Sequence, residues 1–356
     1  MAEARAEVER VPFGRLPGGE EVDAFVLRGA GGVEMRVTGF GGAIVSLLVP
    51  DRDGRPADVV LGYDDVQGYV DDRAYFGSLI GRCANRIRGG RFALDGREHR
   101  LPVNDGPNHL HGGPRGFHKA LWRVEPLESA DGVGLALAHD SPDGDQGYPG
   151  AVRARVTYLL TPANELVVDY RAEADRPTPV NLTQHSYFNL TGDPARTILD
   201  HALRLEADGI TPVDDTLIPT GEVMPVAGTP FDFREPAPIG SRIGADDAQL
   251  ARAGGYDHNF VLRGGDGLRP AARVHEPGSG RVLEVHTTEP GIQFYSGNFL
   301  DGTVAGKGGV RYAYRCGFCL EPQHFPDSPN HPGFPSTILR PGETYSSRTV
   351  YRFAVE

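Results

Sequence analysis

His185 stands in a run of ten residues, Asn181 to Leu190 (NLTQHSYFNL), that carries many hydrogen-bonding groups but is otherwise typical of a strand. A buried hydroxyl or amide without a partner costs about 1–3 kcal/mol, so such a run indicates that something polar is held there. An imidazole has an unperturbed pKa of about 6.5 and exchanges a proton near neutrality. His185 is therefore the first candidate for proton transfer.

A carboxylate far along the chain is the complementary candidate. Glu321 follows a strand-like run and precedes a proline-bounded loop in residues 317–327 (GFCLEPQHFPD), and loops borne on a rigid sheet often hold functional residues. Taken alone, it would more often be a solvated loop carboxylate. An acid and a base together could open a cyclic hemiacetal, because one oxygen must lose a proton while another gains one.

Three further segments place polar groups beside small or aromatic residues. Asn85 and Arg86, in GRCANRI, offer an amide and a fixed fork of donors suited to hydroxyl and carboxylate oxygens, although an isolated arginine is more often structural. Asp257, in YDHNF, and Gln293, in GIQFYSGNF, are flanked by aromatic residues. Aromatic surfaces beside acids and amides suit the apolar faces and hydroxyl rims of sugars.

The histidines of NHLHGG leave three interpretations open. On a strand His109 and His111 would share a face. They could be metal ligands, structural histidines or contacts to sugar hydroxyls. A metal site of this type usually needs a nearby carboxylate, and residues 112–117 contain none. We favour the sugar contact over a metal site and expect chelators to leave activity intact.

Short strands must position these residues. The 356 residues include 48 glycines and 29 prolines, about a fifth of the chain, which does not fit long helices. Hairpins are predicted at Asp95-Gly96, between residues 153–160 and 165–173, and at residues 278–280; further strands are predicted within residues 33–50, at 58–63 and at 349–355, and one short helix at 246–252. With no repeat or linker, residues 1–356 are expected to form a single antiparallel β domain.

Charge and composition exclude several classes of partner. The net charge is −12 and Lys119 and Lys307 are the only lysines, so no basic stripe exists for nucleic acid. Residues 1–10 carry mixed charge without the apolar segment of a signal peptide, and we expect them to be a poorly ordered tail. No run of about 20 apolar residues is present for a membrane span. The sequence carries no signal for oligomeric state.

The three cysteines are Cys83, Cys316 and Cys319. A small odd number suggests free thiols in a reducing compartment, which indicates a cytoplasmic protein. One C-x-x-C pair without a second is weak evidence for zinc or redox chemistry. Packing of small sulfur side chains is the interpretation we favour.

Taken in order, these motifs resemble those of the aldose 1-epimerases, or galactose mutarotases. The resemblance extends from about residue 31 to residue 353 and includes L-E-x-Q-H-F-P-D-S-P-N-H-P and the closing L-R-P-G-E-T-Y. It implies a large antiparallel β-sandwich, often called a supersandwich, and interconversion of the anomers of free aldohexoses such as galactose and glucose without a cofactor. It also implies that His185 is the general acid and Glu321 the general base, and that the substrate-binding residues are Asn85, Arg86, His111, Tyr187, Asp257 and Gln293.

Three other functions are compatible with parts of this pattern. A non-catalytic sugar-binding module would need neither an acid nor a base, a metal-dependent β-barrel enzyme would use His109 and His111, and an epimerase of phosphorylated hexoses would be expected to carry extra cationic residues. The presence of both His185 and Glu321, together with the scarcity of lysine, favours the mutarotase.

Overall fold

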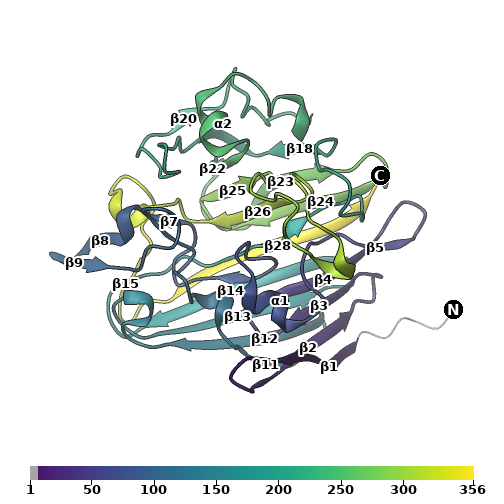
Figure 1. The fold of residues 1–356 in the computed structure, drawn as a ribbon, viewed down its shortest axis with the longest axis horizontal. Coiled ribbons are helices and arrows are strands. Elements are labelled where there is room, and N and C mark those ends of the chain that lie inside the picture. Colours follow the sequence, from purple (N-terminus) through teal and green to yellow (C-terminus); the bar gives the residue numbers. More distant parts are fainter. Residues whose placement is uncertain (1–6) are drawn as a thin grey trace.

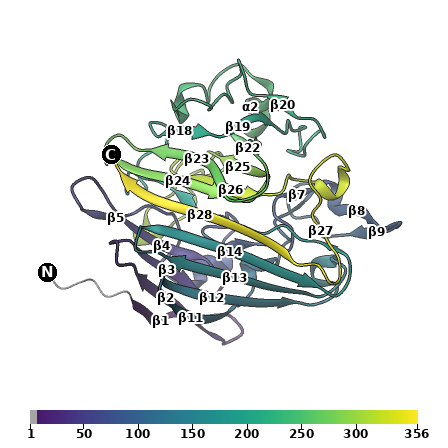
Figure 2. The same ribbon diagram turned by 180° about the vertical axis from the view of Figure 1, so that it is seen from behind.

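Nine strands form the largest sheet of the computed structural model, which describes residues 7–356. Along this sheet every pairing is antiparallel, and buried side chains alternate with more exposed ones, for example in β13, because successive residues of a strand point to opposite faces. Figure 2 shows the sheet from behind, with β28 between β14 and β24. The strand order is β11 (Arg123–Ser129), β12 (Gly132–Ser141), β13 (Val152–Leu160), β14 (Glu165–Ala174), β28 (Tyr345–Val355), β24 (Arg281–Thr287), β23 (Arg269–His275), β18 (Ala202–Leu205) and β21 (Ala237–Pro238).

The N-terminal part of the chain forms a five-stranded antiparallel sheet. It lies against the β11–β12 end of the large sheet (Figure 1). Leu27, Met35 and Leu47 from this sheet belong to the same hydrophobic core as Leu135 and Leu137 of β12. Its strands are, in order, β1 (Glu7–Arg15), β2 (Glu21–Arg28), β3 (Glu34–Thr38), β4 (Ile44–Pro50) and β5 (Pro56–Asp58).

A six-stranded antiparallel sheet carries the functional strands. Its strand β26 is buried on both faces. Phe318 and Leu320 belong to the core together with Phe188 and Tyr351. The Tyr351 hydroxyl donates to the Leu320 carbonyl. The alternation of a strand therefore turns Glu321 to the opposite face. The strand order is β17 (Tyr187–Phe188), β26 (Phe318–Gln323), β25 (Gly291–Tyr295), β22 (Asp257–Leu262), β19 (Ala207–Ile210) and β20 (Met224–Pro225).

Four separate two-stranded sheets complete the strand pairing. They are β6 (Leu79–Ile80) with β16 (Thr183–Gln184), β7 (Arg86–Ile87) with β10 (His109–Leu110), β8 (Arg91–Leu94) with β9 (Arg97–Arg100), and β15 (Thr178–Pro179) with β27 (Ile338–Leu339). The two α-helices of the described chain are α1 (Val66–Asp71) and α2 (Ala248–Ala253), and short 3₁₀ turns occur at Arg88–Gly90, Phe117–Lys119, Asp145–Gly147, Ile239–Ser241, Lys307–Gly309 and Ser328–Asn330. No helix within residues 7–356 has the length and apolar character needed to cross a membrane.

The expected all-β antiparallel fold is confirmed, as are the three predicted hairpins. The predicted helix is α2, shifted by one or two residues. The predicted strand at residues 58–63 is wrong, because β5 ends at Asp58 and only Val60 makes an isolated bridge beyond it. Residues 7–10 belong to β1 and not to a tail, and residues 1–6 lie outside the described residues. That the chain is one domain stays a prediction.

Candidate active site

A cavity of about 710 Å³ opens beside the six-stranded sheet, within the usual range for small-molecule sites. Of the eight residues predicted from the sequence, seven line it: Asn85, Arg86, His111, His185, Tyr187, Asp257 and Glu321. The eighth, Gln293, does not line the cavity; its Nε2 donates to Asp257 Oδ1 over 2.7 Å. Gln293 is therefore placed to orient Asp257 from behind.

The predicted acid and base face each other in this cavity. His185 Nε2 lies 3.7 Å from Glu321 Oε1, and both side chains are almost fully buried. Glu321 Oε2 is buried and has no hydrogen-bond partner among residues 7–356. Because a buried polar atom is normally paired, this orphaned oxygen is available to a bound ligand.

The backbone of His185 is fixed by two hydrogen bonds, and its imidazole packs among neighbouring rings. The backbone N–H of His185 donates to the Ser78 carbonyl, and the backbone carbonyl of His185 accepts from the Gly77 N–H. The ring centroid lies 5.8 Å from that of Tyr75, 5.0 Å from that of His111 and 5.2 Å from that of Tyr187. On the other side of the ring, Nδ1 lies 3.6 Å from the Cys319 sulfur. Nε2 is thus the nitrogen that faces the cavity.

Arg86 connects two carboxylates at the cavity wall. Its Nε donates to Asp105 Oδ2 over 2.7 Å, and its Nη1 lies 3.8 Å from Asp257 Oδ2. Burial raises the pKa of Asp257, while Arg86 and the hydrogen bond from Gln293 lower it. The buried guanidinium offers N–H donors in fixed directions, and the two carboxylates beside it offer acceptors. Both kinds of group can bind sugar hydroxyls.

Asn85 and His111 hold each other in a strained backbone conformation. Both residues have positive φ angles, 61° and 51°, which non-glycine residues adopt only where the surroundings enforce it. The Asn85 N–H donates to His111 Nδ1 over 3.1 Å. Because Nδ1 accepts this bond, the proton of the neutral His111 ring is on Nε2. His111 is therefore a hydrogen-bond donor for an oxygen in the cavity.

Burial sets the protonation of the facing pair. It raises the pKa of Glu321 well above the usual value, with a further increase from Asp257 and an opposing effect of Arg86. It lowers the pKa of His185 to about 4. Over a wide pH range the two groups together thus carry one proton, and without a ligand the carboxyl holds it. This differs from the imidazolium and carboxylate expected from the sequence, although the total number of protons is the same.

His109 and His111 do not form a metal pair. His109 is completely buried, and its ring nitrogens bind the Pro102 carbonyl and the Tyr148 hydroxyl, each over 2.7 Å. The positive φ of His111 ends the alternation that would have placed both rings on one face. Sequence reasoning took the two histidines together, whereas only His111 reaches the cavity.

One other grouping has the composition of a metal site. His111, His185 and Glu321 have ligand atoms within 4.8 Å of one another. A ligating histidine normally donates its second ring proton to an acceptor, whereas His111 accepts a backbone N–H at Nδ1 and carries its proton on the nitrogen that would have to bind the ion. These residues fit a hydrogen-bonding site better than a metal site.

Chelation is therefore expected to leave activity unchanged. Dialysis of the purified protein against EDTA should leave the rate of anomer interconversion within twofold of the untreated rate, because His111 is committed to the Asn85 N–H. Elemental analysis of the same sample gives the metal content directly. Loss of activity on dialysis that is restored by one particular ion would overturn this expectation.

Several residues that line or support the cavity were not singled out from the sequence. Tyr75, from the loop after α1, lines the cavity and contacts both His111 and His185. Asp105 pairs with Arg86 from a loop between β9 and β10. Phe299 is 61% exposed at the cavity and stacks on Tyr295 with centroids 5.7 Å apart. Tyr295 and Phe299 lie within the GIQFYSGNF motif around Gln293, and their place in that motif is the sequence signal that could have identified them.

Comparison with known proteins identifies the class to which this fold and site belong. The family model described as aldose 1-epimerase matches residues 23–352. The chain belongs to the aldose 1-epimerase family. It is 50% identical to a galactose mutarotase of Homo sapiens over 98% of this chain and 99% of that protein, and 42% identical to an aldose 1-epimerase of Escherichia coli K12 over 96% and 97%.

Solved structures agree with this assignment. A galactose 1-epimerase from Lactobacillus acidophilus superimposes with a TM-score of 0.87 at 29% identity over 99% of both chains, and a homologue from C. elegans with 0.84 at 30% identity over 98% of this chain and 99% of that one. The expected fold, family and enzyme class, an isomerase of the mutarotase type, are confirmed.

Proposed function

We propose that the protein interconverts the α and β anomers of free aldohexoses, such as galactose and glucose, by opening and reclosing the sugar ring. The observation that carries the proposal is the pair formed by His185 Nε2 and Glu321 Oε1, which face each other 3.7 Å apart in a cavity of suitable size. An acid and a base that share one proton supply what a hemiacetal needs to break and to form again.

Each half of the reaction uses one arrangement of that proton. When His185 is protonated and Glu321 is a carboxylate, Glu321 takes the proton of the anomeric hydroxyl while His185 donates to the ring oxygen, giving the open aldehyde. After rotation about the C1–C2 bond, neutral His185 takes the proton of the attacking hydroxyl and Glu321 returns its proton to O1. The other anomer is formed and the site returns to its starting state.

Binding of a sugar prepares the ring-opening arrangement. Burial alone leaves the shared proton on Glu321, which is the form that closes the ring. Hydroxyl groups of a bound sugar would donate to the orphaned Oε2 of Glu321 and stabilise its carboxylate, since hydrogen bonds to a charged form favour that form. His111, Arg86, Asn85, Asp257 and Tyr187 would hold the remaining oxygens, an orienting effect that can be worth several kcal/mol.

The wall of the cavity favours uncharged sugars over sugar phosphates. Its acidic residues are Asp105, Asp215, Asp257, Asp301 and Glu321, against the three arginines Arg73, Arg86 and Arg252. Arg86 and Arg252 already pair with Asp105 and Asp215. Such a surface would repel a phosphate dianion.

The three cysteines are free and buried, which supports our placement of the protein in the cytoplasm.

Polarimetry tests the proposed activity directly. Freshly dissolved α-galactose should approach its equilibrium rotation at a rate that rises in proportion to enzyme concentration, above the uncatalysed blank. A panel with glucose, xylose and galactose 6-phosphate should rank the free aldoses above the phosphate. Failure to accelerate mutarotation of any free aldose would refute the proposed function.

The activity should depend on pH as a bell-shaped curve. Below about pH 4, the pKa of His185, both groups become protonated and no base remains. At the alkaline end the pair loses its shared proton and no acid remains, at a pH well above the ordinary glutamate range because burial raises the pKa of Glu321. Blank-corrected kcat/KM between about pH 3 and 10 measures both limbs, which belong to the coupled pair. A rate independent of pH over that range would contradict the paired roles.

A further inference from the structure

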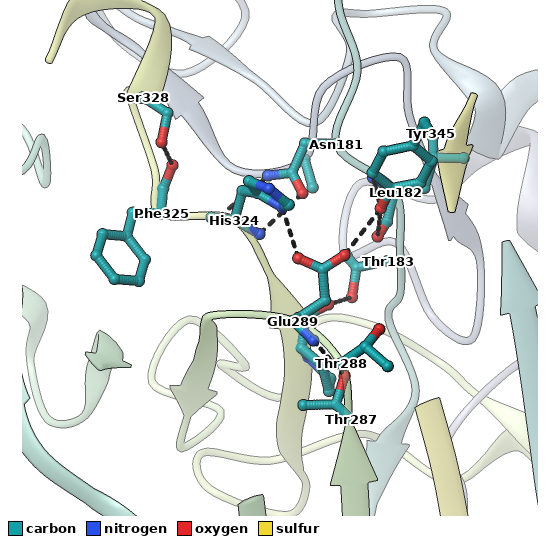
Figure 3. A network of polar contacts seen from close by, with 12 residues as sticks. Asn181, Leu182, Thr183, Thr287, Thr288, Glu289, His324, Phe325, Ser328 and Tyr345 are labelled. Atoms are coloured by element: carbon teal, nitrogen blue, oxygen red, sulfur yellow. Dashed lines mark hydrogen bonds and ion pairs between the residues drawn. The ribbon is translucent and has the colours of Figure 1, made fainter. Parts of the chain in front are cut away.

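A second buried carboxylate lies outside the cavity, at the centre of a polar network that the proposed reaction does not use. Glu289, just before β25, is 2% exposed. Its Oε2 lies 2.6 Å from His324 Nδ1, and its Oε1 accepts from the Tyr345 hydroxyl over 3.0 Å. Figure 3 shows this carboxylate between His324 on one side and the ring of Tyr345 on the other.

The same network bonds the two segments that carry the acid and the base. Asn181 and His324 form a reciprocal pair, in which the His324 N–H donates to Asn181 Oδ1 over 3.0 Å and Asn181 Nδ2 donates to the His324 carbonyl over 3.2 Å. Thr183 Oγ1 donates to the Pro322 carbonyl over 2.8 Å. Tyr345 Oη lies 3.3 Å from the Leu182 nitrogen. His185 and Glu321 lie at most four residues from these contacts.

Side-chain bonds are needed here because the backbone pairing between the two segments is short. The β17–β26 ladder joins Tyr187 to Cys319 and Phe188 to Phe318. Beyond it, β16 pairs with β6, whereas Glu321 pairs with Gln293 of β25. His185 lies between β16 and β17, outside both strands, so no backbone ladder joins the acid directly to the base. Glu289 contacts His324 on the segment of Glu321, reaches the segment of His185 indirectly through Tyr345, and lies two residues before β25.

The pKa shifts of Glu289 and His324 both favour the charged forms of the pair at the centre of the network. Burial by itself raises the pKa of Glu289, but His324 and the hydrogen bonds lower it below the usual value. Burial lowers the pKa of His324, and Glu289 more than offsets this, so that the pKa is raised. A buried ion pair gives little net stability compared with apolar packing, but it can fix one geometry.

We propose that Glu289 is a positioning residue, which through His324 and Tyr345 sets the spacing between His185 and Glu321. The inference depends on the proposed roles of those two residues in proton transfer. Misplacing reacting groups by about 1 Å can cost on the order of 100-fold in rate. Loosening this network should therefore affect the chemical step much more than the binding of sugar.

Glu289→Gln tests the proposal because it keeps the shape and removes the charge. We expect kcat for galactose to fall about 10- to 100-fold while KM changes less than threefold. Glu276→Gln is the matched control: Glu276 is also buried, accepts from the Gly278 and Ser279 N–H groups in the β23–β24 turn, and does not line the cavity. Both variants lose one buried carboxylate, and the control should keep kcat within twofold.

His324→Gln keeps the test decisive if Glu289→Gln does not fold, because the His324 side chain is partly exposed. It should lower kcat about three- to tenfold with KM unchanged. Normal kcat in every folded network variant, with only a lowered melting temperature, would overturn the positioning role. Parallel losses in Glu276→Gln would do the same, since they would report general destabilisation. Absence of mutarotation in the wild-type protein would instead refute the proposed function.

Discussion

Replacing Glu321 with glutamine is expected to reduce kcat for galactose by about 10²- to 10⁴-fold, the usual contribution of a general base. The amide has the same shape but cannot accept the proton of the anomeric hydroxyl. In the wild-type site, Glu321 Oε1 lies 3.7 Å from His185 Nε2, and Oε2 has no hydrogen-bond partner in the described part of the chain. Initial rates by polarimetry give kcat, and calorimetric titration with galactose shows whether binding persists.

The same substitution should not lower thermal stability. Burial raises the pKa of Glu321 well above its usual value, so the folded protein is destabilised by this group at any pH above the usual glutamate pKa. Glutamine has no charge to desolvate, and we expect the melting temperature at pH 7 to stay the same or rise. An inactive variant with a normal melting temperature separates lost chemistry from lost folding. Near-normal kcat would refute the role of base.

The hairpins were predictable because their patterns are local. Residues 153–160 and 165–173 alternate with period two, and the structure pairs them as β13 and β14, with Ala154 opposite Ala172 and Tyr158 opposite Val168. Asp95-Gly96 marks the β8–β9 turn, where both residues have positive φ, a geometry that Asp-Gly adopts at little cost. In such elements neighbouring residues contain the whole signal.

Elements buried on both faces or made of few residues were less predictable. All six residues of β26 are buried, so it shows no alternation of apolar and polar residues. The run from Asn181 to Leu190 is typical of one strand, yet only β16 and β17, of two residues each, are paired. Helix α1 has six residues and one obvious signal, the Asp65 cap that accepts from the Gly68 N–H. Tertiary contacts decide these segments.

The proposed acid, base and most of the proposed binding residues lie together at the cavity, and sequence could single them out because they stand in polar motifs with a known family resemblance. Their supporting residues were not singled out, since support comes from distant parts of the chain. Cys319 appeared to be a packing residue, and it does belong to a hydrophobic cluster, but its sulfur also contacts His185 Nδ1. Gln293 was predicted to bind the sugar, and its hydrogen bond to Asp257 was not foreseen. Sequence separation of 134 and 36 residues hides both contacts.

Replacing His185 with asparagine is the second substitution expected to have a very large effect, again a loss of about 10²- to 10⁴-fold in kcat. Asparagine can hydrogen-bond within the cavity but cannot carry a proton to the ring oxygen and take it back. His201→Asn is the matched control, because His201 is also fully buried, has a pKa lowered by burial to about 4 and does not line the cavity. It should keep kcat within a few-fold even if it lowers the melting temperature.

Combining the two active-site substitutions shows whether the groups act together. If His185 and Glu321 exchange one shared proton with the sugar, either single variant already prevents the transfer. The double variant, His185→Asn with Glu321→Gln, should then be little less active than the less active of the two single variants. This is the behaviour found for groups that act as a unit. Multiplicative losses, measured by the same polarimetric assay above the blank, would mean that each group contributes independently and that proton transfer between them through the sugar is not the mechanism.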